Sequence, residues 1–97
     1  MKKLLLATLL TASCTAQAAT HEQCKEISSL AGTIMQAKQR GVSLADLMSV
    51  KDEKGIIKPV ALSAYKEPSY SGAKYKKKQV VDFKNKWYLI CIGWQVV

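Results

Sequence analysis

Residues 20–41 read THEQCKEISSLAGTIMQAKQRG, and this stretch decides the fold. Its apolar residues recur every three or four positions, which places them on one face of a helix: Cys24, Ile27, Leu30, Ala31, Ile34 and Met35. Thr20 followed by Gln23 forms a capping-box pattern, and Glu22 suits the positive end of a helix. Gly41 is placed for the left-handed conformation that ends helices. The pattern predicts a helix over residues 21–40.

A second long helix is predicted at the other end of the chain. From Ala73 to about Trp94 the apolar residues again step by threes and fours: Val80, Phe83, Trp87, Ile90, Cys91 and Trp94. The alternative for residues 87–97 is a β-strand, because this segment is rich in aromatic and β-branched residues. The periodicity favours the helix.

Two short helices are predicted between the long ones. Ser43 is a candidate N-cap with Asp46 three positions later, and this helix is expected to end near Val50. The third helix is carried by apolar residues at helical spacing: Ile57, Val60, Ala61, Ala64 and Tyr65. Pro68 is expected to stop it, because the residue before a proline avoids the helical region. Met35, Met48 and Trp87 continue apolar stripes and are predicted to lie in the core.

The first 18 residues have the pattern of a secretory signal peptide. Lys2 and Lys3 form a basic start, residues 4–10 are mostly leucine, and Ala16 and Ala18 occupy the positions that a signal peptidase recognises. The apolar run is far shorter than the roughly 20 residues of a membrane span. Cleavage after Ala18 would leave residues 19–97 as one small helical domain in the periplasm.

Cys14 suggests an alternative location for the protein. This cysteine follows Leu10-Thr11-Ala12-Ser13, which is close to the pattern of a bacterial lipoprotein cleavage site, although Thr11 stands where a larger aliphatic residue is usual. Lipidation of Cys14 would anchor the protein to a membrane face.

The predicted mature chain holds two cysteines, Cys24 and Cys91. In an oxidising compartment such a pair predicts one disulfide, here joining the first and last helices. Antiparallel packing of those helices would bring the two cysteines together, and closing so long a loop stabilises the fold by roughly 4 kcal/mol. Zinc is a poor alternative, because His21 is the only histidine. The predicted fold is therefore an all-α bundle of about four helices, two long and two short.

The mature chain is basic. Two of the 15 Lys and Arg residues lie in the predicted signal, which leaves 13 against 7 acidic residues and a net charge of +6. Lys74, Lys76, Lys77 and Lys78 fall at the start of the last predicted helix, where the helix dipole disfavours cations. With Tyr65, Tyr70 and Tyr75 they predict a cationic and aromatic binding surface. The plain alternative is a solvated basic face. Trp94, if exposed, is a further candidate contact.

The sequence lacks motifs that indicate catalysis. It contains no GxSxG, no HExxH and no glycine-rich phosphate loop. His21 lies almost at the predicted mature terminus, where we expect it to be solvated. We expect no enzyme activity, no cofactor and no bound metal.

Three stretches, residues 36–48, 64–70 and 82–91, resemble a group of small, largely uncharacterised proteins of proteobacteria and their phages and prophages. Members carry signal peptides. The resemblance implies an exported helical protein with a single disulfide, and it assigns no catalytic residue. Members often have a more acidic stretch before the final helix, whereas this chain has Lys74 to Lys78. The small single-disulfide helical architecture also resembles acid-stress periplasmic chaperones.

Three functions follow as expectations. The first is a non-enzymatic periplasmic interaction protein, a phage or prophage accessory that binds an envelope or lysis component. The second is a binder of anionic envelope surfaces or of incoming nucleic acid, as in superinfection exclusion. The third is a chaperone of the acid-stress type. The phage association depends on the resemblance alone.

Overall fold

The computed structural model describes residues 20–52 and 54–93, and the regular elements within them are all helices. They are α1 (His21–Gln39), α2 (Leu44–Met48), α3 (Ile57–Lys66) and α4 (Ala73–Gly93). The predicted all-α bundle of two long and two short helices is confirmed. The predicted signal peptide, Cys14 and Trp94 lie outside the described residues.

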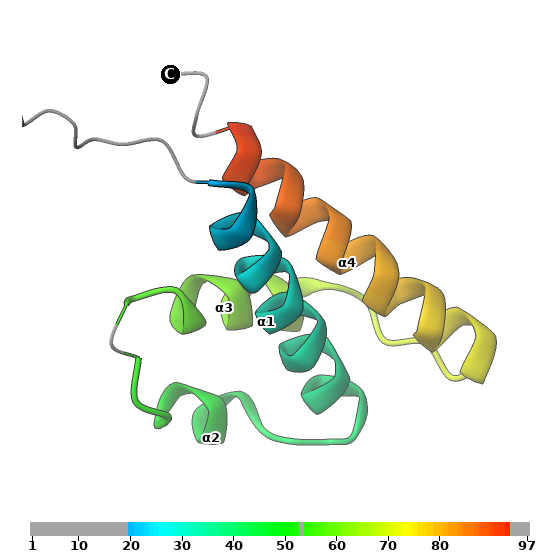
Figure 1. Cartoon of the computed structure of the whole chain (residues 1–97). Coiled ribbons are helices and arrows are strands. Elements are labelled where there is room, and N and C mark those ends of the chain that lie inside the picture. Colours follow the sequence, from blue (N-terminus) through cyan, green and yellow to red (C-terminus); the bar gives the residue numbers. More distant parts are fainter. Residues whose placement is uncertain (1–19, 53, 94–97) are drawn as a thin grey trace, which may run out of the picture.

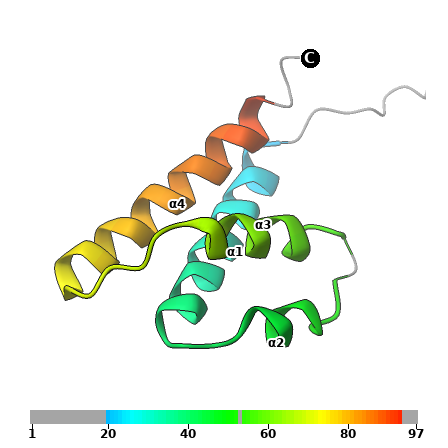
Figure 2. The same cartoon turned by 180° about the vertical axis from the view of Figure 1, so that it is seen from behind.

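The two long helices are antiparallel and are joined by a disulfide. The start of α1 and the end of α4 lie together at the top of Figures 1 and 2, and the start of α4 lies at the far end. Cys24 and Cys91 are bonded, with their Cα atoms 5.4 Å apart, and both side chains are fully buried. The predicted disulfide is confirmed, and α4 continues as a helix to Gly93 where a strand was the alternative.

Helix α1 is the centre of the fold because it packs against both α3 and α4, whereas α2 packs mainly against α3. The core consists of small and apolar side chains from α1, α3 and α4: Ala31, Ile34, Met35, Val60, Ala61, Ala64, Phe83 and Trp87. The predicted core positions of Met35 and Trp87 are confirmed, whereas Met48 is only partly buried and packs against the core. Burial of each large apolar side chain stabilises the fold by about 1.5–3 kcal/mol.

Local sequence signals set the ends of α1 and the start of α2. The Thr20 hydroxyl accepts from the Gln23 backbone N–H at 3.1 Å, and the Gln23 side chain accepts from the Thr20 N–H at 2.8 Å. Gly41 has φ 91°, a left-handed conformation that other residues rarely adopt. The Ser43 hydroxyl accepts from the Asp46 N–H at 3.0 Å. These contacts confirm the predicted caps.

Helix α3 is capped from a distance by Asp52. Its carboxylate accepts from the backbone N–H groups of Ile56, Ile57 and Lys58 at 2.9, 3.0 and 3.1 Å. Desolvation raises the pKa of Asp52, but the bonds from Ile57, Lys58 and Ile56 outweigh it, so the pKa lies below its ordinary value. Asp52 therefore does the work of an N-cap residue although it lies several residues before the helix.

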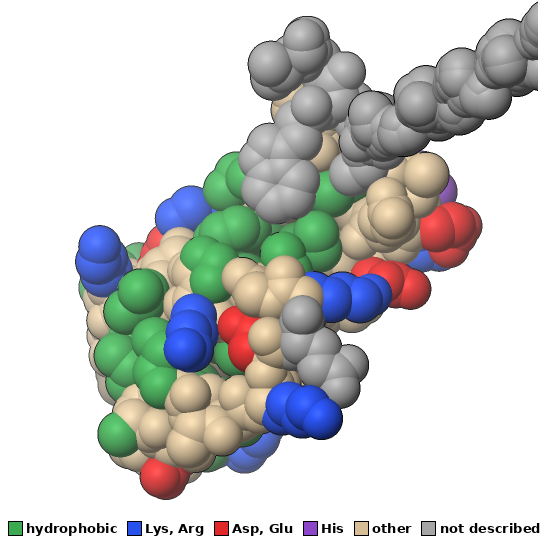
Figure 3. Space-filling view, turned by 90° about the vertical axis from the view of Figure 1, so that its left-hand side faces the viewer, with side chains coloured by type: hydrophobic (Ala, Val, Ile, Leu, Met, Phe, Trp, Pro, Cys, Tyr) green, Lys and Arg blue, Asp and Glu red, His purple; other side chains and the backbone are tan. Residues whose placement is uncertain are grey.

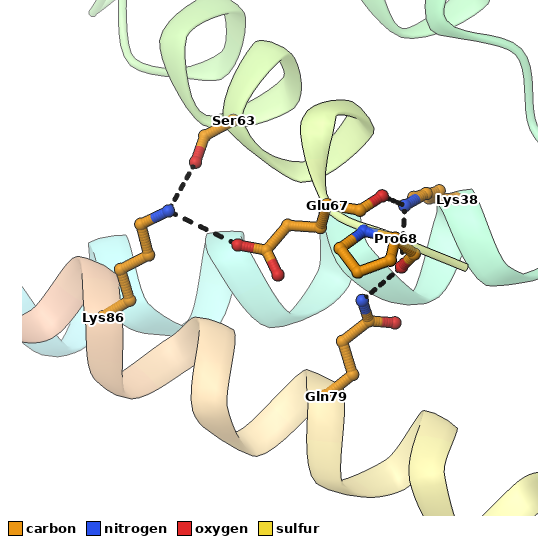
Figure 4. Close-up of polar contacts among 6 residues, drawn as sticks. All are labelled: Lys38, Ser63, Glu67, Pro68, Gln79 and Lys86. Atoms are coloured by element: carbon orange, nitrogen blue, oxygen red, sulfur yellow. Dashed lines mark hydrogen bonds and ion pairs between the residues drawn. The ribbon is translucent and has the colours of Figure 1, made fainter. Parts of the chain in front are cut away.

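Two lysines fix the end of α3 between the long helices (Figure 4). Lys38 on α1 donates to the backbone carbonyl of Glu67 and, at 3.4 Å, to that of Pro68. Lys86 on α4 donates to the Ser63 hydroxyl at 3.3 Å and to the Glu67 carboxylate at 3.4 Å. Glu67 is extended, as expected for the residue before a proline. The positive charges of Lys38 and Lys86 thus serve the fold.

Candidate functional site

The structure places the four predicted lysines in the first two turns of α4, which has no acidic residue in its first turn. They do not share one environment. Lys78 lies 2.8 Å from the Asp82 carboxylate one turn later, and both side chains are exposed. The hydrogen bond to Asp82, followed by the charge of that carboxylate, raises the pKa of Lys78. An exposed pair of this kind contributes little to stability.

Lys76 and Lys77 line a groove between the first half of α4 and the second half of α1. The groove has a volume of about 440 Å³, and its remaining walls combine amide, apolar and cationic side chains: Gln36, Gln39, Ala73, Val80, Val81 and Lys84. No carboxylate of residues 20–52 or 54–93 lines it. Among the described residues, no ion pair involves Lys76, Lys77 or Lys84. The groove therefore carries three cations whose charge the described part of the chain does not neutralise.

A glycine on α1 shapes one end of the groove. A Cβ atom at Gly32 would lie 2.8 Å from Cδ and 2.9 Å from Cγ of Lys84, closer than side-chain atoms normally approach. The absence of a side chain at Gly32 therefore lets the aliphatic part of Lys84 cross α1. The Ser28 hydroxyl donates to the Lys84 carbonyl at 3.1 Å and holds the two helices together at this level.

A chain of amide hydrogen bonds fixes the other end of the groove. The Gln39 side-chain nitrogen donates to the Lys76 carbonyl at 2.9 Å and to the Gln79 side-chain oxygen at 3.1 Å. Gln79 is 5% exposed, and its own nitrogen donates to the Pro68 carbonyl at 2.7 Å (Figure 4). Both N–H groups of Gln39 are thereby used. Gln39 is a wall of the groove, and Gln36 is the amide left to donate to a ligand.

The predicted tyrosines separate in the structure. Tyr70 and Tyr75 are exposed, and their ring centroids lie 6.4 Å apart beside the start of α4. Tyr65 is partly buried, and its hydroxyl donates to the Val42 carbonyl, which ties α3 to the loop after α1. Burial, and then the charge of Asp46, raises the pKa of Tyr65. Tyr65 therefore supports the fold, and Tyr70 with Tyr75 stays near the lysines.

The α2–α3 side of the molecule has a different charge pattern. Figure 3 shows this side, and acidic side chains lie there beside basic and hydrophobic ones. Glu26 and Lys54 approach to 4.0 Å with both side chains largely exposed. A surface of mixed sign offers no strong attraction to an ion of either sign, so the α1–α4 groove is the better candidate for binding an anionic group.

The sequence analysis missed the two groove residues that could donate to an anionic group besides Lys76 and Lys77, which are Lys84 and Gln36. Lys84 lies seven and eight positions after Lys77 and Lys76, a spacing that returns to the same helix face, so periodicity could have found it. Gln36 gives no such signal, because its role depends on how α1 and α4 pack. Trp94 is outside the described residues.

Other chemistry has little support in the described part of the chain. His21 is exposed, as predicted, and its Nδ1 lies 2.7 Å from the Tyr88 hydroxyl. Within residues 20–52 and 54–93, no group of three His, Cys, Asp or Glu residues could hold a metal ion. In the same residues no helix combines the length and apolarity needed to cross a membrane.

Comparison of the chain with models of protein families, with curated proteins and with solved structures finds no match.

Proposed function

We propose that this protein is an exported, non-enzymatic binding protein that recognises an acidic partner protein of the bacterial envelope. The observation that carries the proposal is the α1–α4 groove, where Lys76, Lys77 and Lys84 line one surface without a described acidic neighbour. Uncompensated cations of this kind attract an anionic partner and speed its encounter. Lys74, Tyr70 and Tyr75 extend the same surface around the start of α4.

Export to the periplasm is part of this proposal. The signal-peptide pattern of residues 1–18 supports it, with cleavage after Ala18 and a lipid anchor at Cys14 as the alternative. The buried Cys24–Cys91 bond also supports it, because disulfides persist in oxidising compartments. N-terminal analysis of the exported protein should give Ala19, whereas a lipid adduct on Cys14 would establish the anchored form.

The resemblance to proteins of proteobacteria and their phages supports a more specific role, an accessory protein that binds an envelope or lysis component. The second candidate is binding to anionic surfaces or nucleic acid, and the same three unpaired lysines favour it. The two differ in their salt dependence. Phosphate binding releases counterions, so the logarithm of the affinity for duplex DNA falls with the logarithm of salt by about 0.9 for each phosphate neutralised.

A charge-matched pair of variants tests the proposal. The four-lysine variant changes Lys74, Lys76, Lys77 and Lys78 to Gln. The control variant changes four exposed lysines elsewhere to Gln and loses the same charge: Lys25, Lys54, Lys58 and Lys66. We expect periplasmic capture to recover an acidic envelope protein with the wild type and the control, and to lose it with the four-lysine variant.

Titration of the captured protein at low and high salt then measures the contribution of charge. Equal binding by the four-lysine variant and the control at both salts would show that the lysines form only a solvated face. Tighter binding to duplex DNA than to the captured protein would establish the second candidate.

A further inference from the structure

We propose that the α1–α4 groove binds an amphipathic acidic helix of the partner, with apolar side chains against Val80 and Val81 and carboxylates at the lysines. This inference rests on the proposed function and names the element of the partner that the groove recognises.

The groove alternates apolar and cationic layers along α4. Ala73 forms the first layer, Lys76 and Lys77 the second, Val80 and Val81 the third, and Lys84 the fourth. Successive layers are three or four residues apart, which is one helical turn or about 5.4 Å. A partner helix has the same rise for each turn. A stripe on it that reads acidic, apolar, acidic over successive turns would therefore meet the lysine, valine and lysine layers in register.

The dimensions agree with one helix face. From Ala73 to Lys84 the axis of α4 rises about 16 Å, or three turns. The volume of about 440 Å³ lies in the range of protein binding pockets. Recognition by a helix laid in a groove uses anchor residues one turn apart, which is the spacing offered here.

Charge and shape favour this occupant over three others. A nucleic-acid backbone could meet the lysines, but its sugars and phosphates would leave the valine layer without an apolar contact. A flat bilayer cannot enter a groove between two helices. A second copy of this chain offers Glu22 and Glu26 on α1, but Ser29 and Thr33 follow on that face, where an apolar layer is required.

Val81 separates this inference from simple charge attraction. Its side chain is 50% exposed and lines the groove, so Val81→Ser removes apolar contact without changing any charge. Leu89 lies on the same helix and is 68% exposed, but it does not line the groove, so Leu89→Ser is the matched control. Loss of a half-exposed valine contact should weaken binding by about fivefold.

The experiment uses the full mature protein and two synthetic peptides of about 18 residues, long enough for a helix to form in part. The first peptide carries Glu and Leu in alternating layers on one helix face, and the second has the same composition in a scrambled order. We expect the wild type to bind the first peptide at least fivefold more tightly. We expect Val81→Ser to remove that preference and Leu89→Ser to keep it, while circular dichroism shows both variants folded.

The outcomes separate the two proposals. Equal affinity for both peptides, sensitive to the four lysines, would overturn the helix inference and leave binding of an acidic partner standing. Binding to phosphatidylglycerol vesicles but to neither peptide would also overturn it and would point to a lipid headgroup. Failure of every acidic probe, together with failure of periplasmic capture, would overturn both.

Discussion

The two ends of the α1–α4 pair are held together in different ways. At one end Cys24 and Cys91 are bonded and fully buried, and His21 contacts Tyr88 beside them. At the other end no covalent bond joins the described helices, hydrogen bonds through Gln79 hold them, and lysines collect where the helix dipole disfavours them. Stability concentrated at the first end allows the second to keep a charge arrangement that local stability does not favour.

The largest expected effect comes from removing the disulfide. Replacing both Cys24 and Cys91 with Ser opens a loop whose cysteines lie 67 positions apart, and the loop-entropy relation gives a loss of about 4 kcal/mol in the free energy of unfolding. Urea unfolding of the variant and of the reduced wild type measures this loss. Nearly unchanged stability in both would show that the disulfide does not make its end of the α1–α4 pair the more stable one.

A smaller loss is expected at the groove end from Gln79→Met. The substitution keeps the length of the side chain but removes its hydrogen bonds with Gln39 and with the Pro68 carbonyl, and each such bond contributes about 0.5–1.5 kcal/mol. Amide hydrogen exchange at the start of α4 should become faster. Gln36→Met is the control, because Gln36 is exposed and has no described hydrogen bond. Equal effects of the two changes would show that the hydrogen bonds of Gln79 do not hold the groove end together.

Gly32→Ala should change stability by less than about 1 kcal/mol, because the gain from replacing a helical glycine offsets the contact with Lys84. It should nevertheless weaken peptide binding, since Lys84 must move from its place along the groove. Gly93→Ala is the control, because a Cβ atom there meets nothing within 4 Å. Peptide binding is measured by fluorescence anisotropy. Unchanged binding by Gly32→Ala would show that the position of Lys84 does not contribute to it.

The smallest effect on stability is expected from the four-lysine variant. Its melting temperature should be equal to that of the wild type or slightly higher, because the charges oppose the helix dipole and one another. The ion pair between Lys78 and Asp82 limits the gain. A clear fall in melting temperature would show that these lysines stabilise the fold, and would weaken the contrast between the two ends.

The sequence predicted the elements of this fold well because most of their signals are local. The capping box at Thr20, the left-handed Gly41 and the Ser43 cap each involve residues within a few positions of one another. The disulfide was predictable because only Cys24 and Cys91 follow the predicted signal peptide. The cap from Asp52 was missed, because its carboxylate reaches N–H groups four to six residues ahead.

The candidate site was predicted only in part. The lysines of α4 were visible in the sequence, but their division into the paired Lys78 and the groove residues Lys76 and Lys77 was not proposed. The groove itself depends on the crossing of α1 and α4, which Gly32 and Gln79 set through contacts more than 10 residues apart in sequence. Such contacts leave no periodic pattern in the chain.

The position of the disulfide also determines how the domain responds to mechanical tension. Cys24 and Cys91 lie within a few residues of the two ends of the described chain, 20 and 93. A force that pulls these ends apart is therefore carried through the sulfur–sulfur bond, and only the short segments outside the two cysteines can be stretched. The core and the groove lie inside the loop that the disulfide closes, so a pull on residues 20 and 93 does not stretch them.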